Sequence, residues 1–168
     1  MNDTAGPGEC PDARQMLDHV LSSDLRYLMG VSYLVLCNNQ ITNRYIERHY
    51  DMPVQAWSAL YAIASFPGLL ARDIQVLFPR PQNTVSRAVA LLVGRGHVRE
   101  EPLPGDARAK RLFTTPSGLA LLDGILTAVR ARQEEMFAPL TPAERETFLA
   151  LSRKIALGPR LTQSDTMP

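Results

Sequence analysis

The stretch that decides the fold runs from Ala71 to Thr115 and reads ARDIQVLFPRPQNTVSRAVALLVGRGHVREEPLPGDARAKRLFTT. The segments ARDIQVLF and 82–93 have the spacing of apolar residues that is typical of helices, and the turn PRP lies between them. The segments HVREE and KRLFT predict two strands, with PLPGDARA as the turn between them. Helix, turn, helix and a two-stranded wing, in that order, predict a winged helix-turn-helix in a mainly α (α+β) protein.

The second of these helices divides its side chains between two faces. Val85, Val89 and Leu92 recur at steps of four and three residues, so we expect this stripe to face a core. The residues at its start that lie off the stripe are polar or positively charged, and they are candidate contacts to base edges and phosphates: Gln82, Asn83, Thr84, Ser86 and Arg87. A recognition helix that enters the major groove of double-stranded DNA needs this distribution.

Positive charge is concentrated in the same window. The chain has a net charge of only +1, but residues 80–111 contain seven basic residues against three acidic ones and carry +4, which leaves −3 for the rest. A local basic patch on a nearly neutral protein is typical of phosphate contacts. A solvated surface face is the alternative for any charge cluster taken alone. Because the basic patch coincides with the helix-turn-helix pattern, we favour DNA binding.

The rest of the sequence indicates neither an enzyme nor a membrane protein. The start, MNDTAGPGECPDA, has no apolar run, and the longest apolar segment, LMGVSYLVLC, is too short to span a bilayer. We find no phosphate-binding glycine loop, nucleophile elbow or zinc-protease pair. We therefore expect a cytoplasmic protein, in which Cys10 and Cys37 are free thiols. These cysteines lack metal-ligand spacing, so we expect no metal, and we expect no cofactor.

The sequence predicts five segments along the chain. Residues 12–50 form a helical segment that Ser22–Asp24 can break in two, since such residues favour helix N-caps. Residues 53–114 form the winged helix-turn-helix domain, and residues 115–157 form two helices. Thr115 before a proline, and Thr141 with Glu144 three residues later, predict the starts of those two helices. We expect residues 1–11 to form a disordered tail and residues 158–168 to form a flexible tail.

The helices on both sides of the winged domain are too apolar to remain solvated. The simplest solution is a homodimer in which the terminal helices of two chains bury each other's apolar stripes. Packing within one chain, against the winged domain, is the alternative. A two-fold dimer also suits DNA, because paired recognition helices can meet successive major grooves.

With these motifs in register, the chain resembles the MarR family of regulators over about residues 12–157. The resemblance rests on Trp57 before the helix-turn-helix, on TVSRAVALLVGRGHVRE, on GDARAKRLFTTPSG and on LTPAERETFLALSRKI. It implies a homodimeric transcriptional regulator, usually a repressor, that binds a palindromic operator and responds to a ligand or to stress.

The resemblance also assigns roles in the wing. Arg108 matches the arginine that enters the minor groove, and Asp106 matches the acid that orients it. Lys110 and Arg111 are adjacent on a strand and point to opposite faces, and we favour Lys110 for a phosphate. The chain departs from the family pattern at Pro81, which has no capping side chain, a difference that bears on the angle at which the recognition helix enters the groove.

An effector pocket is a further implication of the resemblance. Asn38 lies among polar residues in an apolar helix, and buried polar groups need partners. Family effectors bind between the dimer helices and the winged domain, and the candidate lining residues here are Tyr33, Cys37, Asn38, Trp57, Tyr61 and Phe66. We expect a small aromatic or phenolic effector. An exposed helix face with core aromatics is the alternative to a pocket.

Two other functions stay open at this stage. The first is a thiol-based, peroxide-responsive repressor of the same fold, in which Cys37 is the reactive residue. The second is a winged helix that serves only as a protein-interaction module. The concentrated positive charge and the polar start of the recognition helix argue against the second.

Overall fold

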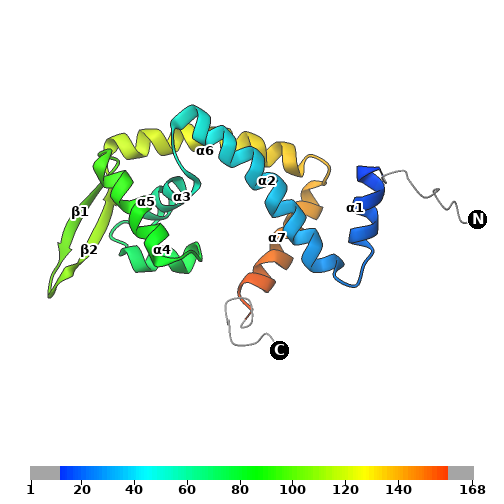
Figure 1. The fold of residues 1–168 in the computed structure, drawn as a ribbon, viewed down its shortest axis with the longest axis horizontal. Helices are drawn as coiled ribbons and strands as arrows, with labels where there is room; N and C mark the ends of the chain where they lie inside the picture. Colours follow the sequence, from blue (N-terminus) through cyan, green and yellow to red (C-terminus); the bar gives the residue numbers. More distant parts are fainter. Residues whose placement is uncertain (1–11, 159–168) are drawn as a thin grey trace, which may run out of the picture. The chain divides into compact units, whose positions relative to one another are not determined.

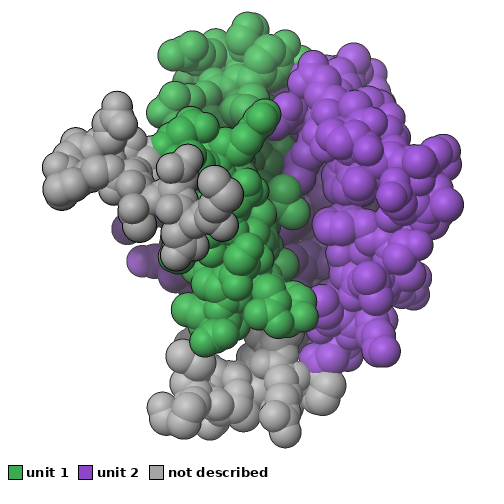
Figure 2. Space-filling view, turned by 90° about the vertical axis from the view of Figure 1, so that its right-hand side faces the viewer, with its two compact units in different colours: residues 1–54 green, residues 55–168 purple. Residues whose placement is uncertain are grey.

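The computed structural model describes residues 12–158, apart from the side chains of Ala107 and Arg108. The chain divides into two compact units, residues 1–54 and 55–168, which Figure 2 shows in different colours. Figure 1 labels the elements: α1 (Ala13–Leu21), α2 (Arg26–Tyr50), α3 (Val54–Ser65), α4 (Ala71–Leu77), α5 (Gln82–Gly94), β1 (Val98–Leu103), β2 (Asp106–Thr114), α6 (Pro116–Phe137) and α7 (Pro142–Ala156).

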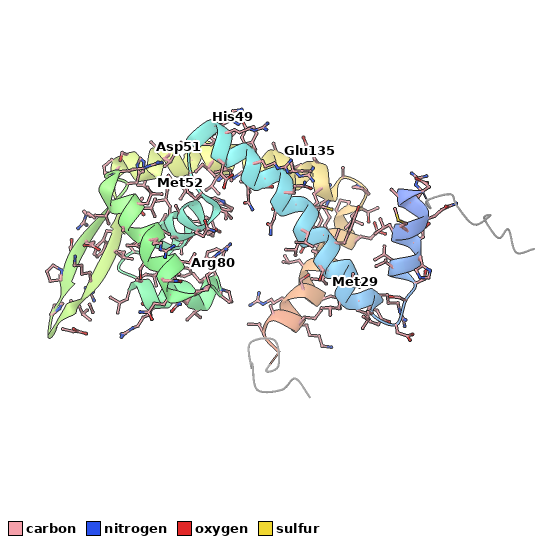
Figure 3. All side chains as sticks on the ribbon, viewed as in Figure 1. Met29, His49, Asp51, Met52, Arg80 and Glu135 are labelled. Atoms are coloured by element: carbon pink, nitrogen blue, oxygen red, sulfur yellow. The ribbon has the colours of Figure 1, made fainter. Side chains whose placement is uncertain are left out.

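The first unit contains two helices with a break between them. The predicted interruption at Ser22–Asp24 is confirmed: α1 ends at Leu21, and the Ser23 hydroxyl donates a 2.7 Å hydrogen bond to the Val20 carbonyl. A side chain that bonds its own backbone in this way competes with helix propagation. At the other end of α2, Asp51 adopts a left-handed conformation with φ 48°, and Met52 follows it (Figure 3).

The core of the second unit is formed by α3, α4, α5, the inner side of the hairpin and the start of α6. In Figure 1 the hairpin lies beside α4 and α5. α3 contributes mostly small buried residues, which let neighbouring elements approach closely. The buried apolar side chains of this unit are Ala56, Ala59, Leu60, Ala62, Ile63, Ile74, Val85, Ala88, Val89, Leu92, Val98, Leu112, Leu122 and Ile125.

The wing is an antiparallel hairpin that is longer than predicted. Residues 102–103 belong to β1 and residues 106–109 to β2, so the prediction of a turn over the whole of 102–109 is wrong. The strands are joined at Gly105, whose φ of 87° suits glycine. Proline has no backbone N–H to donate to a facing strand. Pro102 is tolerated because each strand of a two-stranded sheet is hydrogen-bonded along one edge only, and its other edge needs no donor.

The wing returns directly into α6. As predicted, the Thr115 hydroxyl caps this helix, accepting a 3.1 Å hydrogen bond from the Gly118 N–H. The same hydroxyl donates to the Gly96 carbonyl at 2.7 Å, and the Thr115 N–H donates to the His97 carbonyl at 3.0 Å. These bonds tie the start of α6 to the end of the recognition helix and the start of the wing.

The joint between α6 and α7 depends on capping and on one arginine. The predicted box between Thr141 and Glu144 is present, and the bonds from the Thr141 N–H and hydroxyl lower the pKa of Glu144. Arg145 donates to the Phe137 and Leu140 carbonyls at 3.1 and 3.3 Å and pairs with Glu134 at 2.7 Å. That pairing lowers the pKa of Glu134.

Candidate nucleic-acid interface

The recognition helix α5 has the two faces that the sequence predicts. Val85, Ala88, Val89 and Leu92 are buried. The candidate contact residues lie on the other side: Thr84 is half-buried, and the exposed ones are Gln82, Asn83, Ser86 and Arg87. The helix therefore packs through one face and presents hydrogen-bonding groups and a guanidinium on the other, which suits base-edge and phosphate contacts.

The start of α5 is held without a side-chain cap. Pro81 occupies the N-cap position and makes no capping hydrogen bond, as its lack of a polar side chain requires. The turn between α4 and α5 is fixed instead by Gln75, whose side-chain amide donates a 2.9 Å hydrogen bond to the Arg80 carbonyl. Figure 3 labels Arg80. The sequence did not reveal the role of Gln75, because an amide five residues ahead of a turn matches no capping motif.

The wing residues have partners that the sequence did not reveal. Nζ of Lys110 lies 2.5 Å from Oε2 of Glu100 on the facing strand. Arg99 pairs with Glu101 and also lies over the Phe113 ring, 4.5 Å from its centroid. Asp106, the predicted orienting acid, is exposed at the start of β2. Arg108 belongs to β2, but its side chain lies outside the described part of the structure.

An open cavity of about 330 Å³ lies between the recognition helix and the wing. It brings together two candidate DNA contacts, Ser86 from α5 and Lys110 from β2. Its other lining residues are Leu70, Ala71, Arg72, Val89, Ala90, Glu100, Ala109 and Leu112. The floor is apolar, since Val89 and Leu112 are buried, and charged side chains lie at the rim.

The candidate pocket residues fall into two groups. Trp57 and Tyr61 are one turn apart on α3, with Phe66 just beyond its end, and Tyr61 and Phe66 are exposed. The indole N–H of Trp57 is buried and has no hydrogen-bond partner among the described residues. A buried donor of this kind calls for an explanation.

The second group lies on α2. Tyr33 and Cys37 are one turn apart and interact through their side chains. The hydrogen bond with Cys37, then the charge of Cys37 and finally burial raise the pKa of Tyr33. The carbonyl oxygen of the Asn38 side chain accepts a 3.1 Å hydrogen bond from the Thr42 hydroxyl, so part of its polar capacity is satisfied within the helix.

Residues 12–158 contain neither a membrane span nor a metal cluster. None of the described helices combines the length and the apolar character that crossing a membrane requires. Within the same residues, no three His, Cys, Asp or Glu side chains are grouped closely enough to hold a metal ion.

A polar recognition helix, a charged hairpin beside it and a core behind both define a winged helix of the DNA-binding class. Comparison with known proteins agrees with this. Residues 50–109 match the model of the MarR family, so this part of the chain is similar to MarR-family proteins. A putative transcriptional regulatory protein for the hcr operon of Thauera aromatica is 28% identical over 99 residues, which cover 59% of this chain and 60% of that protein.

Solved structures share the fold. A MarR-family transcriptional regulator from Silicibacter pomeroyi is 27% identical, with a TM-score of 0.73, and the match covers 87% of this chain and 97% of that one. A cysteine-to-serine mutant of MarR from Escherichia coli, complexed with operator DNA, is 20% identical with a TM-score of 0.63, covering 80% and 99% of the two chains. At that identity, the likeness concerns the fold alone.

Proposed function

We propose that the protein is a homodimeric, sequence-specific repressor that binds a palindromic operator through α5 and the wing. The observation that carries the proposal is the exposed polar face of α5, with Arg87 on it, opposite a buried apolar stripe. The operator complex of the mutant MarR from Escherichia coli supports this use of the fold. Arg108 is proposed as the minor-groove contact and Asp106 as the acid that orients it.

The dimer is supported by apolar side chains that the single chain leaves exposed. On α7, Phe148, Leu151 and Ile155 recur at helical spacing and are 40%, 57% and 60% exposed. α2 separately exposes a longer set, consisting of Tyr27, Leu28, Met29, Val31, Tyr33, Leu34, Val35, Leu36, Ile41 and Tyr45. Contiguous apolar surface of this kind marks interaction sites. A second copy of the chain is the proposed partner, because two-fold symmetry also supplies the second recognition helix.

The test measures mass and operator symmetry together. Sedimentation at micromolar concentration is expected to give twice the 18.6 kDa chain mass. Selection from a pool of random duplexes is expected to recover two inverted half-sites, with centres about 10 base pairs apart. Leu151→Glu should give the monomer mass and lose binding to the selected site, because its charge would be buried in the dimer but hydrated in the single chain.

Val76→Glu is the matched control for the mass measurement. Val76 is 82% exposed on α4, which is not one of the terminal helices, so this variant should keep the dimer mass. A monomeric wild type, or selected sites without inverted symmetry, would contradict the proposal.

We further propose that a small aromatic or phenolic acid releases the protein from DNA by binding beside Trp57. The support is the buried Trp57 N–H without a described partner, to which a carboxylate or phenol oxygen could bind. In a dimer, the two recognition helices can be spaced so that both reach the DNA or so that they do not. Such a ligand changes operator affinity only if it binds one of these two states more tightly than the other. A coupling of about 1–3 kcal/mol is sufficient for a response.

Trp57 is the only tryptophan in the sequence, so its fluorescence reports directly on this site. We expect phenolic acids to quench that fluorescence and to weaken operator binding over the same concentration range. Quenching without a change in affinity would contradict the regulatory role. If no ligand in a broad panel acts, peroxide treatment of the wild type and of Cys37→Ser distinguishes a thiol switch from a constitutive DNA binder.

A further inference from the structure

The wing contains an acid that binds one of its own proposed DNA contacts. Glu100 and Lys110 form a cross-strand ion pair in which Nζ and Oε2 are 2.5 Å apart. The Glu100 side chain is 28% exposed and the Lys110 side chain 55% exposed. Lys110 therefore already has an anionic oxygen as its partner before any phosphate arrives.

Strand register places this pair on the side of the wing that meets the recognition helix. Glu100 lies directly opposite Leu112, and Lys110 is two residues from Leu112 on the same strand. Residues opposite each other, and residues two apart, share a face of a hairpin. Leu112 is 1% exposed, so this face turns towards the core. Both members of the pair line the same cavity as Ser86 of α5.

We propose that Glu100 competes with DNA phosphate for Lys110 and so sets the affinity of the protein for DNA. A duplex lying on α5 and the wing passes its backbone over the cavity between them. For Lys110 to bind a phosphate there, it must exchange the Glu100 carboxylate for the phosphate oxygen, and Glu100 then stands as an unpaired negative charge beside the backbone. The inference rests on the proposed DNA-binding function and concerns the strength of binding.

The opposite face of the wing offers a matched control. Glu101 pairs with Arg99 and lies directly across from Arg111, with Phe113 on the same face. Replacing Glu101 with glutamine removes the same charge from the neighbouring residue, but on the side away from Ser86 and the cavity. A difference between Glu100→Gln and Glu101→Gln therefore reports on the ion pair with Lys110 and not on net charge.

The experiment measures fluorescence anisotropy of a labelled random-sequence duplex and of the selected inverted repeat across a series of salt concentrations. Glu100→Gln is expected to bind both duplexes about fivefold more tightly than the wild type, since an exposed ion pair resists exchange only modestly. The dependence of log affinity on log salt should steepen by about one unit, because one more lysine is available to neutralise a phosphate. Glu101→Gln should stay within about twofold of the wild type.

A double variant tests whether the gain passes through the lysine. Lys110→Gln should abolish the tightening produced by Glu100→Gln, so Glu100→Gln/Lys110→Gln should lose the steeper salt dependence. If Glu100 instead holds Lys110 in position for DNA, Glu100→Gln would weaken binding, and the proposal is overturned. Equal affinities for Glu100→Gln, Glu101→Gln and a DNA-binding wild type overturn this inference alone. A wild type that binds neither duplex overturns the proposed function as well.

Discussion

Replacing Gly118 with alanine is expected to lower the free energy of unfolding by about 3 kcal/mol, the upper part of the range for overpacked sites. A Cβ atom at this position would lie 2.1 Å from the His97 carbonyl oxygen and 2.8 Å from Cγ2 of Thr114. The carbonyl cannot move away freely, because it accepts the Thr115 N–H at 3.0 Å. Thermal and chemical denaturation followed by circular dichroism measure the loss.

Gly94→Ala is the control for this prediction. Gly94 is the last residue of α5, and a Cβ atom there meets nothing within 4 Å. Alanine has a higher helix propensity than glycine, so this variant should be as stable as the wild type or slightly more stable. Equal stabilities for Gly118→Ala and Gly94→Ala would show that the start of α6 can shift away from the wing at little cost.

Arg87→Ala is expected to weaken binding to the selected operator by about 1–3 kcal/mol, which is roughly a ten- to hundredfold loss. Arg87 is exposed on the polar face of α5, and its neighbours Ala88 and Val89 are buried, so the substitution removes a contact without disturbing the core. Arg108→Ala in the wing should cause a loss of similar size. Fluorescence anisotropy at several salt concentrations measures both variants.

The salt series separates the kinds of contact that Arg87 can make. A lost base contact lowers affinity for the operator more than for random duplex, whereas a lost phosphate contact lowers both and flattens the salt dependence by about one unit. Arg130→Ala on α6 removes the same charge from an exposed position far along the chain and should leave affinity unchanged. An Arg87→Ala protein that binds the operator as tightly as Arg130→Ala would falsify the proposed role.

Local features of the chain were predictable where their physical cause is local. The four- and three-residue steps of Val85, Val89 and Leu92 set which side of α5 is buried, because helical geometry alone converts spacing into a face. The caps at Thr115 and Thr141 likewise involve atoms three residues apart. The break between α1 and α2 belongs to the same class, since Ser23 bonds a carbonyl in its own turn.

The wing was predicted less completely, and its misassigned residues show why. Pro102 and Asp106 are turn residues by composition, yet β1 runs to Leu103 and β2 begins at Asp106, so only the residues between them form the turn. Hydrogen bonding to the facing strand outweighs local preference, and strand propensity depends strongly on such context. The segments HVREE and KRLFT were recognisable as strands, because the alternation of side chains within each segment can be read without knowing which strand faces it.

The sequence by itself determined the winged helix-turn-helix order, the polar face of the recognition helix and the helix caps. All of these follow from spacings of a few residues. Only the tertiary structure decided that Glu100 pairs with Lys110, that Gly118 approaches the His97 carbonyl too closely for a side chain, and that Ser86 and Lys110 share one cavity. These contacts join residues ten or more positions apart, and chain packing, not local periodicity, brings such residues together.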